Sequence, residues 1–220
     1  MVSPTELEPR PLLGGQVIAP DWPTAPVVLR FRKPRHAPKI GFFDALYARR
    51  SGPCGKATED GLGAILYHSM RLRERRHDGR FGTWESRSAP SAGGIHGIRP
   101  FVFPCEEVSP GGLYDPTTHG LIGFGNDPQL RRRVHSHLRD LDLQSEGYFV
   151  QFVADTAAYA SRYENSGSLV LRDAGALLSV ICMVAAALDL SCRPLGHLGG
   201  PMVEAAGFST RYQGVGGIMI

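Results

Sequence analysis

The feature that most constrains how this chain can fold is one long apolar segment near its C-terminal end. Between Val170 and Leu190 polar residues are few, which predicts a helix that is apolar nearly all round. Its longest apolar stretch, 174–190, is shorter than the ~20 residues that a membrane span needs, and it carries Asp189. We therefore expect a central helix that is covered on all sides, in part by a second subunit.

The other predicted elements follow one another in a mixed order, which favours an α+β fold over a doubly wound sheet. The segment 148–154 (YFVQFVA) has the composition of a buried strand, and 112–116 and 119–124 predict a hairpin reversed by Asp-Pro-Thr-Thr. Further strands are expected at 27–31, 101–103 and 214–220, helices at 41–50, from the Thr58 cap to about Arg76 and at 127–141, and a long surface loop at 77–97.

The first 40 residues contain eight prolines and predict an extended N-terminal arm. Each proline fixes φ and disfavours helix at the residue before it. The remainder, 41–220, has the size of one domain with a single core, so we expect an arm (1–40) and one domain.

Charge and cysteine usage exclude several classes of protein. A net charge of +3 is too small to indicate nucleic-acid binding, which needs a concentrated basic face. The four cysteines form neither a C-x-x-C pair nor a zinc pattern, so we expect no metal site and a reduced, cytoplasmic chain. The N-terminus lacks an apolar signal segment, and no membrane role is expected. No lysine follows Lys56, which excludes lysine chemistry from the later three quarters of the chain.

Three short segments carry most of the information about function. Arg49-Arg50-Ser51 ends the first predicted helix, Pro90-Ser91-Ala92-Gly93-Gly94 precedes a strand, and Pro194-Leu195-Gly196-His197-Leu198-Gly199-Gly200 follows the central helix. In order and spacing, and with the hairpin between the second and third, they resemble the nitroreductase-like superfamily, most closely its SagB-type dehydrogenases. This resemblance implies a mixed, mainly antiparallel sheet flanked by helices around a central apolar helix. It also implies a homodimer that holds FMN at its subunit interface.

The resemblance assigns Arg49, Arg50 and Ser51 to the FMN phosphate. Arginine offers a planar set of donors that meets phosphate oxygens in pairs, and serine adds a hydroxyl. A basic helix C-terminus is the ordinary alternative for these residues. Arg211, the only Lys or Arg after Arg193, is the late candidate for a second phosphate contact.

The segment Pro90-Ser91-Ala92-Gly93-Gly94 suits a flat ring, because small residues let backbone N–H groups approach the isoalloxazine. Gly199 and Gly200 would line the ring or the phosphate from the C-terminal side. A glycine-rich turn and a helix cap are the ordinary alternatives for these two segments.

The sequence departs from the family pattern at three points. Pro53 stands where a second phosphate-side arginine is usual. Arg162-Tyr163 stands where azoline dehydrogenases carry Lys-Tyr, and arginine stays protonated, so it cannot be a general base. Tyr163 is the candidate for proton transfer or else a packing anchor, and Arg162 would hold an anion or lower the pKa of Tyr163. Ala176 lies in a helix segment where the family often has polar residues.

The resemblance implies an FMN-dependent oxidoreductase that oxidises a peptide-derived azoline, with a peptide substrate and a peptide-modifying cyclase as expected partners. Two alternatives stay open. The same fold could use NAD(P)H to reduce nitroaromatics or quinones, or it could serve as a non-catalytic partner of a peptide-modifying enzyme.

Overall fold

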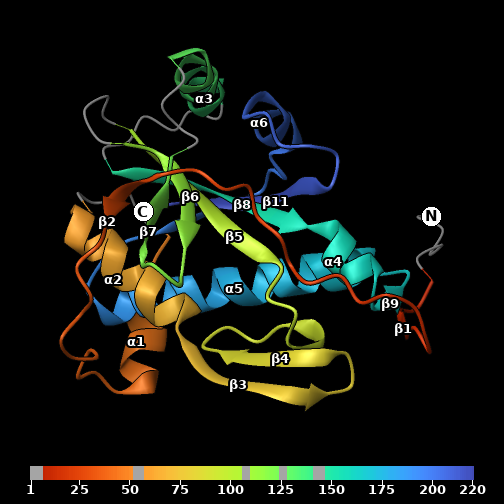
Figure 1. Cartoon of the computed structure of the whole chain (residues 1–220). Helices are drawn as coiled ribbons and strands as arrows, with labels where there is room; N and C mark the ends of the chain where they lie inside the picture. The colour runs from red at the N-terminus through yellow and green to blue at the C-terminus, as the bar shows by residue number, and fades with distance from the viewer. Residues whose placement is uncertain (1–6, 52–56, 106–109, 124–127, 141–146) are drawn as a thin grey trace, which may run out of the picture.

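The computed structural model describes residues 7–51, 57–105, 110–123, 128–140 and 147–220. At its centre lies a seven-stranded sheet in the order β10-β11-β8-β5-β6-β7-β2, with each neighbouring pair antiparallel (Figure 1). The strands are β2 (Val27–Arg30), β5 (Ile98–Pro104), β6 (Gly112–Asp115), β7 (Gly120–Ile122), β8 (Tyr148–Asp155), β10 (Arg193–Leu195) and β11 (Tyr212–Met219). The helices are α1 (Phe42–Ala48), α2 (Glu59–Met70), α3 (Pro128–Asp140), α4 (Thr156–Ala160), α5 (Gly167–Ala187) and α6 (Gly200–Ala205).

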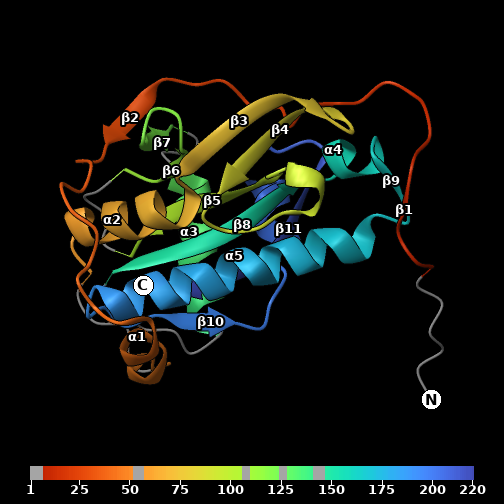
Figure 2. The same ribbon diagram turned by 90° about the horizontal axis from the view of Figure 1, so that it is seen from below.

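Helices cover both faces of the sheet. The core therefore consists of two clusters, one on each face, and the side chains of β8 contribute to both. Val150 and Phe152 join the cluster that contains α2 and α5, whereas Phe149 and Val153 join the cluster that contains α3 and α6. Figure 1 shows α5 and α2 on one side of the sheet and α3 and α6 on the other, and Figure 2 shows α5 in front of the sheet when the protein is seen from below. A strand covered on both faces is apolar at successive positions, which accounts for the composition of β8. The predicted α+β architecture is therefore confirmed.

The central helix α5 is covered on one side only, so the expectation of cover on all sides does not hold within one chain. Its buried residues are Val170, Asp173, Ala174, Leu177, Ile181, Cys182 and Ala185. These positions recur every three or four residues and face α2, α1 and β11, while Leu171 on another side is 49% exposed. By length and a mean hydropathy of 1.9, α5 is the one candidate membrane span in the described part of the chain, a test that core helices also pass.

The strands β3 (Leu72–Gly79) and β4 (Gly82–Arg87) form a separate two-stranded hairpin. The sequence predicts a helix end and a surface loop here, and that prediction is wrong. Arg75 lies opposite Glu85, and the two side chains form an ion pair across the strands at 2.5 Å. Arginine and glutamate favour helix in isolation, so local propensity did not indicate this strand, which is accompanied by cross-strand pairing within the hairpin.

The remaining main elements agree with the sequence predictions. The Thr58 side chain caps α2 by accepting a hydrogen bond from the Gly61 amide at 3.1 Å. In the β6–β7 turn the Asp115 carboxylate accepts bonds from the amides of Thr117 and Thr118. The predicted ends at Phe124, Asp127 and Leu141 lie outside the described residues. Short elements that the sequence did not indicate are β1 (Arg10–Pro11), β9 (Tyr163–Glu164), β10, α4, α6 and the 3₁₀ turn Ala92–Gly94.

The described part of the N-terminal arm runs along the body of the protein and includes the short strands β1 and β2 (Figure 1). Hydrogen bonds attach it to the body at several points. The Leu12 amide donates to the Arg162 carbonyl at 2.9 Å, and the Asp21 amide donates to the Asp155 carboxylate at 2.9 Å. Strand β1 pairs with β9, and β2 forms one edge of the large sheet. Residues 10–21 of the arm therefore lie beside α4 and β9, whereas β2 lies at the edge of the sheet next to β7.

We predict that Gly199→Ala destabilises the protein by roughly 2–4 kcal/mol. Gly199 has a φ of 83°, and a Cβ there would overlap the buried Gln151 side chain. Gly200→Ala is the matched control, because a Cβ at Gly200 meets nothing within 4 Å. Urea unfolding of both variants tests this, and equal stability of the two would contradict it.

Candidate functional site

One carboxylate fixes the segment Pro90–Gly94 to the central helix. Asp173, on the buried side of α5, accepts hydrogen bonds from the Ala92 amide at 3.0 and 3.1 Å and from the Tyr159 hydroxyl at 2.8 Å. The Ser91 hydroxyl donates to the same carboxylate. Asp173 is 8% exposed, and a carboxylate this buried is stable only when such donors surround it.

The segment is also folded tightly on itself. The amides of Gly94 and His96 donate to the carbonyl and hydroxyl oxygens of Ser91 at 3.1 and 2.9 Å. Gly93 and Gly94 have φ values of 56° and 64°, in the left-handed region that favours glycine. A Cβ at Gly94 would lie 2.6 Å from the Trp84 ring nitrogen. Two of the amides that we expected to face a flavin ring, those of Ala92 and Gly94, are thus already hydrogen-bonded within the chain.

Tyr163 lies directly against this segment. Its hydroxyl oxygen is 2.7 Å from the position that a Cβ on Gly93 would take, and its ring meets Phe81 edge-on at 5.3 Å between centroids. Tyr163 belongs to β9, which pairs with β1 of the arm. The fold therefore brings the predicted proton-transfer residue to the predicted cofactor segment, although the two are far apart in the sequence.

Arg162 connects the arm to α4. Its guanidinium donates to the carbonyls of Ile18 at 2.6 Å and Ala158 at 2.8 Å, and the residue is 5% exposed. The Arg162 charge therefore lies next to Tyr163, but both of these hydrogen bonds hold backbone carbonyls of the arm and of α4 in place.

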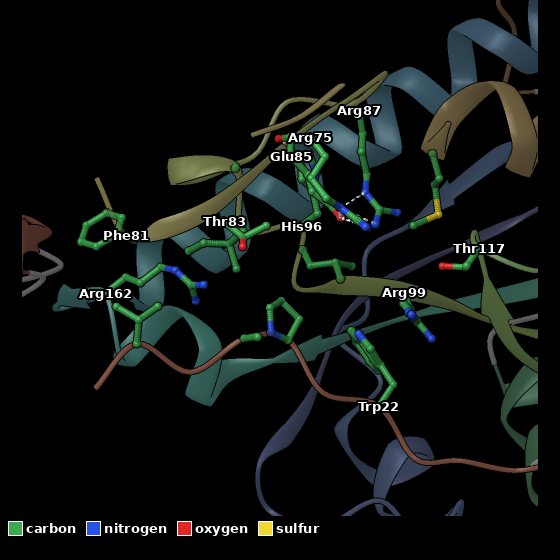
Figure 3. Close-up of a pocket in the computed structure, with 17 residues that line it drawn as sticks. Trp22, Arg75, Phe81, Thr83, Glu85, Arg87, His96, Arg99, Thr117 and Arg162 are labelled. Atoms are coloured by element: carbon green, nitrogen blue, oxygen red, sulfur yellow. Dashed lines mark hydrogen bonds and ion pairs between the residues drawn. The ribbon is translucent and has the colours of Figure 1, made fainter. Parts of the chain in front are cut away.

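A cavity of about 410 Å³ lies beside the segment, between the β3–β4 hairpin and the arm (Figure 3). This volume is within the range typical of small-molecule sites. Figure 3 shows Arg75, Glu85 and Arg87 together on the hairpin side and Trp22 on the side of the arm. The lining residues are Val17, Ala19, Pro20, Trp22, Met70, Arg75, Phe81, Thr83, Glu85, Arg87, Gly94, Ile95, His96, Ile98, Arg99, Thr117 and Arg162.

Glu85 is shared between two arginines of this cavity. One carboxylate oxygen accepts from Arg75 at 2.5 and 3.0 Å, and the other accepts from Arg87 at 2.6 and 3.0 Å. Burial alone would raise the pKa of Glu85, but the hydrogen bonds and charges of Arg87 and Arg75 lower it below the usual value. Glu85 is therefore ionised at neutral pH and neutralises only one of its two partners.

Arg99 contributes a further cation at the start of β5. Its guanidinium lies 3.3 Å from the Asp115 carboxylate and 4.9 Å from the centre of the Trp22 ring. Burial lowers the pKa of Arg99 to about 10, so the group remains charged at neutral pH.

The residues Arg49 to Ser51 follow α1 and are partly or fully exposed. They lie away from Asp173 and the groups that donate hydrogen bonds to it. Helix α1 packs against α5. The pKa of Cys182 is lowered chiefly by its hydrogen bond with Cys192 and also by the Arg49 charge, so Arg49 lies near that turn of α5. Nine residues separate Asp173 from Cys182, or roughly 13 Å along a helix at 1.5 Å per residue. Pro53 lies outside the described residues.

Three of the predicted cofactor residues belong neither to the group around Asp173 nor to the segment 49–51: Gly199, Gly200 and Arg211. Gly199 precedes α6 and packs on the Gln151 side chain, on the side of the sheet opposite α5. Arg211 donates to both oxygens of the Asp155 carboxylate, at 2.8 and 2.7 Å. The candidate late phosphate cation is therefore already paired.

Sequence reasoning missed two parts of this site. Asp173 was visible as an acid within an apolar helix, and a buried carboxylate requires donors from elsewhere in the fold. The arginine cluster of the cavity depends on the β3–β4 hairpin, and residues 72–79 gave no strand pattern from which it could be found.

Glu85 gives the stability of the protein a defined pH dependence. A carboxylate whose folded pKa is lowered stabilises the fold above its unfolded pKa, and that contribution is lost as the pH falls through the folded value. We predict that wild type melts at a higher temperature than Glu85→Gln at pH 7, and that the difference narrows towards pH 3. Thermal melts across this range measure the difference, and a gap that stays constant with pH would contradict the prediction.

No protein-family model and no curated protein sequence matches the chain. Among solved structures, a proposed nitroreductase from Ralstonia eutropha JMP134 matches with a TM-score of 0.66, 18% identity and coverage of 97% of both chains. The Escherichia coli microcin synthetase McbBCD complex, with truncated pro-MccB17 bound, matches with a TM-score of 0.60 and 14% identity, over 78% of this chain and 68% of the other.

A proposed nitroreductase from Desulfovibrio desulfuricans, solved in complex with FMN, matches with a TM-score of 0.54 and 15% identity, over 82% of this chain and 85% of the other. At sequence identities this low, structural similarity shows that the fold is shared but does not show that the chemistry is shared. The chain has the nitroreductase-like fold.

Proposed function

We propose that this protein is a cytoplasmic FMN-dependent oxidoreductase of the SagB type, which oxidises a peptide-derived azoline in natural-product biosynthesis. The observation that carries the proposal is the approach of the Tyr163 hydroxyl to Gly93, because it joins the proposed proton-transfer group to the proposed flavin segment. The FMN-bound and microcin-synthetase neighbours support the proposal at the level of fold.

The phosphate end of FMN fits the residues at the end of α1. Arg49 donates to the Ser51 hydroxyl at 3.1 Å, and Arg50 donates to backbone carbonyls, including that of Arg49 at 3.0 Å. Among the described residues neither arginine forms an ion pair with an acid, so both charges are open to an anion. Two arginines and a hydroxyl are suitable donors for a phosphate dianion.

The ring end of FMN fits less completely. The Ala92 amide is bonded to Asp173, and the Gly94 amide is bonded to Ser91, so neither is open to a ring acceptor. Pro90–Gly94 would therefore contact the ring mainly through its rigid, small surface. We expect this to lower the affinity for FMN relative to a site with open amides.

The proposed chemistry divides one oxidation between a hydride and a proton. Converting an azoline to an azole removes a hydride from one ring carbon and a proton from the neighbouring carbon. Bound FMN would supply the hydride acceptor. Tyr163 would have to act as its phenolate, which would take the proton and become the phenol, with the Arg162 charge beside it to favour the ionised form. Phe81 limits the movement of the Tyr163 ring by packing on it edge-on.

We further propose a homodimer that completes the flavin site. On α1 the apolar side chains of Phe42, Phe43, Leu46 and Tyr47 are 66%, 63%, 40% and 69% exposed. They adjoin an apolar groove between α1 and the open side of α5, lined by Ile40, Val180 and Met183 among others. Exposed apolar surface of this extent favours a protein partner. A second copy would cover it and bring its own flavin residues to the interface.

The expected partners beyond this dimer are a peptide substrate and a peptide-modifying cyclase. The same fold occurs in the microcin synthetase complex, which was solved with a truncated pro-peptide. We propose that this chain likewise associates with a peptide and with a peptide-modifying enzyme.

The first experiment is incubation of the purified protein with FMN, followed by gel filtration and an absorbance spectrum. We expect a flavin band that elutes with a dimer. Arg50→Gln should weaken FMN binding by about tenfold, because it removes one charged phosphate donor. Arg132→Gln, an exposed arginine on α3, is the matched control and should bind FMN as wild type does. Protein that stays colourless after reconstitution would contradict the proposal and favour a non-catalytic binding partner.

The substrate is tested separately on flavin-loaded protein without oxygen. A thiazoline or oxazoline peptide should bleach the flavin band, and Tyr163→Phe should slow the bleaching without releasing the flavin. Rapid bleaching by NADPH, with no response to azoline peptides, would instead favour a nitroreductase-type reductase.

A further inference from the structure

The cavity between the hairpin and the arm contains more positive than negative charge. Its lining includes Arg75, Arg87, Arg99 and Arg162 but a single acid, Glu85. Asp115 lies behind Arg99 and compensates that charge. The four arginines, set against the two acids Glu85 and Asp115, leave a net excess of two positive charges among these described residues.

Arg75 and Arg87 line the cavity from the hairpin side, and each has one donor group that does not bind Glu85. Arg75 and Arg87 each use Nε and Nη2 to bind Glu85, so each has an Nη1 group for which the described residues provide no acceptor. The Arg87 side chain is 14% exposed and already desolvated, which strengthens its attraction for an anion. In Figure 3 both guanidinium groups gather at one end of the cavity, with Phe81 at the other.

Flat apolar surfaces accompany the charges. Trp22 lines the cavity from the arm with Arg99 stacked on its ring, and Phe81 lines it from the hairpin turn. Such a combination suits an organic group with an aromatic or unsaturated body and an oxyanion at one end.

We infer that this cavity is a binding site for a small organic oxyanion, a carboxylate or a phosphate ester, held by Arg75 and Arg87 with its apolar body against Trp22 and Phe81. Glu85 sets the affinity, because it occupies donors of both arginines and offsets one of their charges. The inference concerns binding alone and does not depend on the proposed redox function.

The test is titration of the full-length, flavin-free protein with benzoate and phenyl phosphate, with benzamide as the neutral analogue, in a phosphate-free buffer. We expect both anions to bind more tightly than benzamide. Raising the salt from about 20 mM to about 200 mM should weaken binding of the anions, because charge interactions are screened. Preference for benzoate or for phenyl phosphate identifies the carboxylate or the phosphate as the natural group.

Three variants assign the binding to this cavity. Arg75→Gln should weaken anion binding by roughly five- to tenfold, since a half-exposed charged donor is lost. Arg76→Gln is the matched control, because Arg76 lies on the same strand and pairs with Glu74 outside the cavity, and it should change binding by less than about twofold. Glu85→Gln should bind the anions more tightly than wild type. Equal binding of benzamide, or equal effects of the two arginine variants, would overturn the inference.

Discussion

The arrangement of the candidate site depends on the carboxylate of Asp173. This group is buried in a mainly apolar helix, and it accepts hydrogen bonds from the Ser91 hydroxyl, the Ala92 amide and the Tyr159 hydroxyl. Burial, followed by the charge of Asp173, raises the pKa of Tyr159, so the phenol stays protonated and serves as a donor. The Asp173 carboxylate thus joins α5, α4 and the segment that precedes β5, and it fixes the position of Gly93, against which Tyr163 lies.

Local sequence patterns predicted the parts of this protein whose structure is decided locally. The apolar helix, the β8 strand, the Thr58 cap and the Asp115 turn all follow from composition and short-range hydrogen bonding. The β3–β4 hairpin could not be predicted in this way, because the arginines and glutamate of β3 favour helix and the exposed strand shows no alternation of apolar and polar residues. The sequence allowed the segments of the candidate site to be proposed from their composition, but their contacts with Asp173 and the cavity beside them depend on residues distant in the sequence and could not be predicted.

The spacing of the predicted FMN segments along α5 limits how a flavin could bind. Arg49 lies near Cys182 and the Pro90–Gly94 segment is fixed at Asp173, so the two predicted ends of the FMN site meet α5 roughly 13 Å apart. The open apolar sides of α1 and α5 lie next to the first of these ends. Under the proposed function a second copy covers these surfaces and completes the site, while the arginine-lined cavity receives a ligand on the side of the arm.

Asp173 organises the Pro90–Gly94 segment before any ligand binds, and this can be measured by hydrogen exchange of the Ala92, Gly94 and Ile95 amides, followed by NMR on flavin-free wild type and on Asp173→Asn. We expect slow exchange at all three amides in wild type and faster exchange in the variant. Rapid exchange in flavin-free wild type, slowed only when FMN is added, would contradict it.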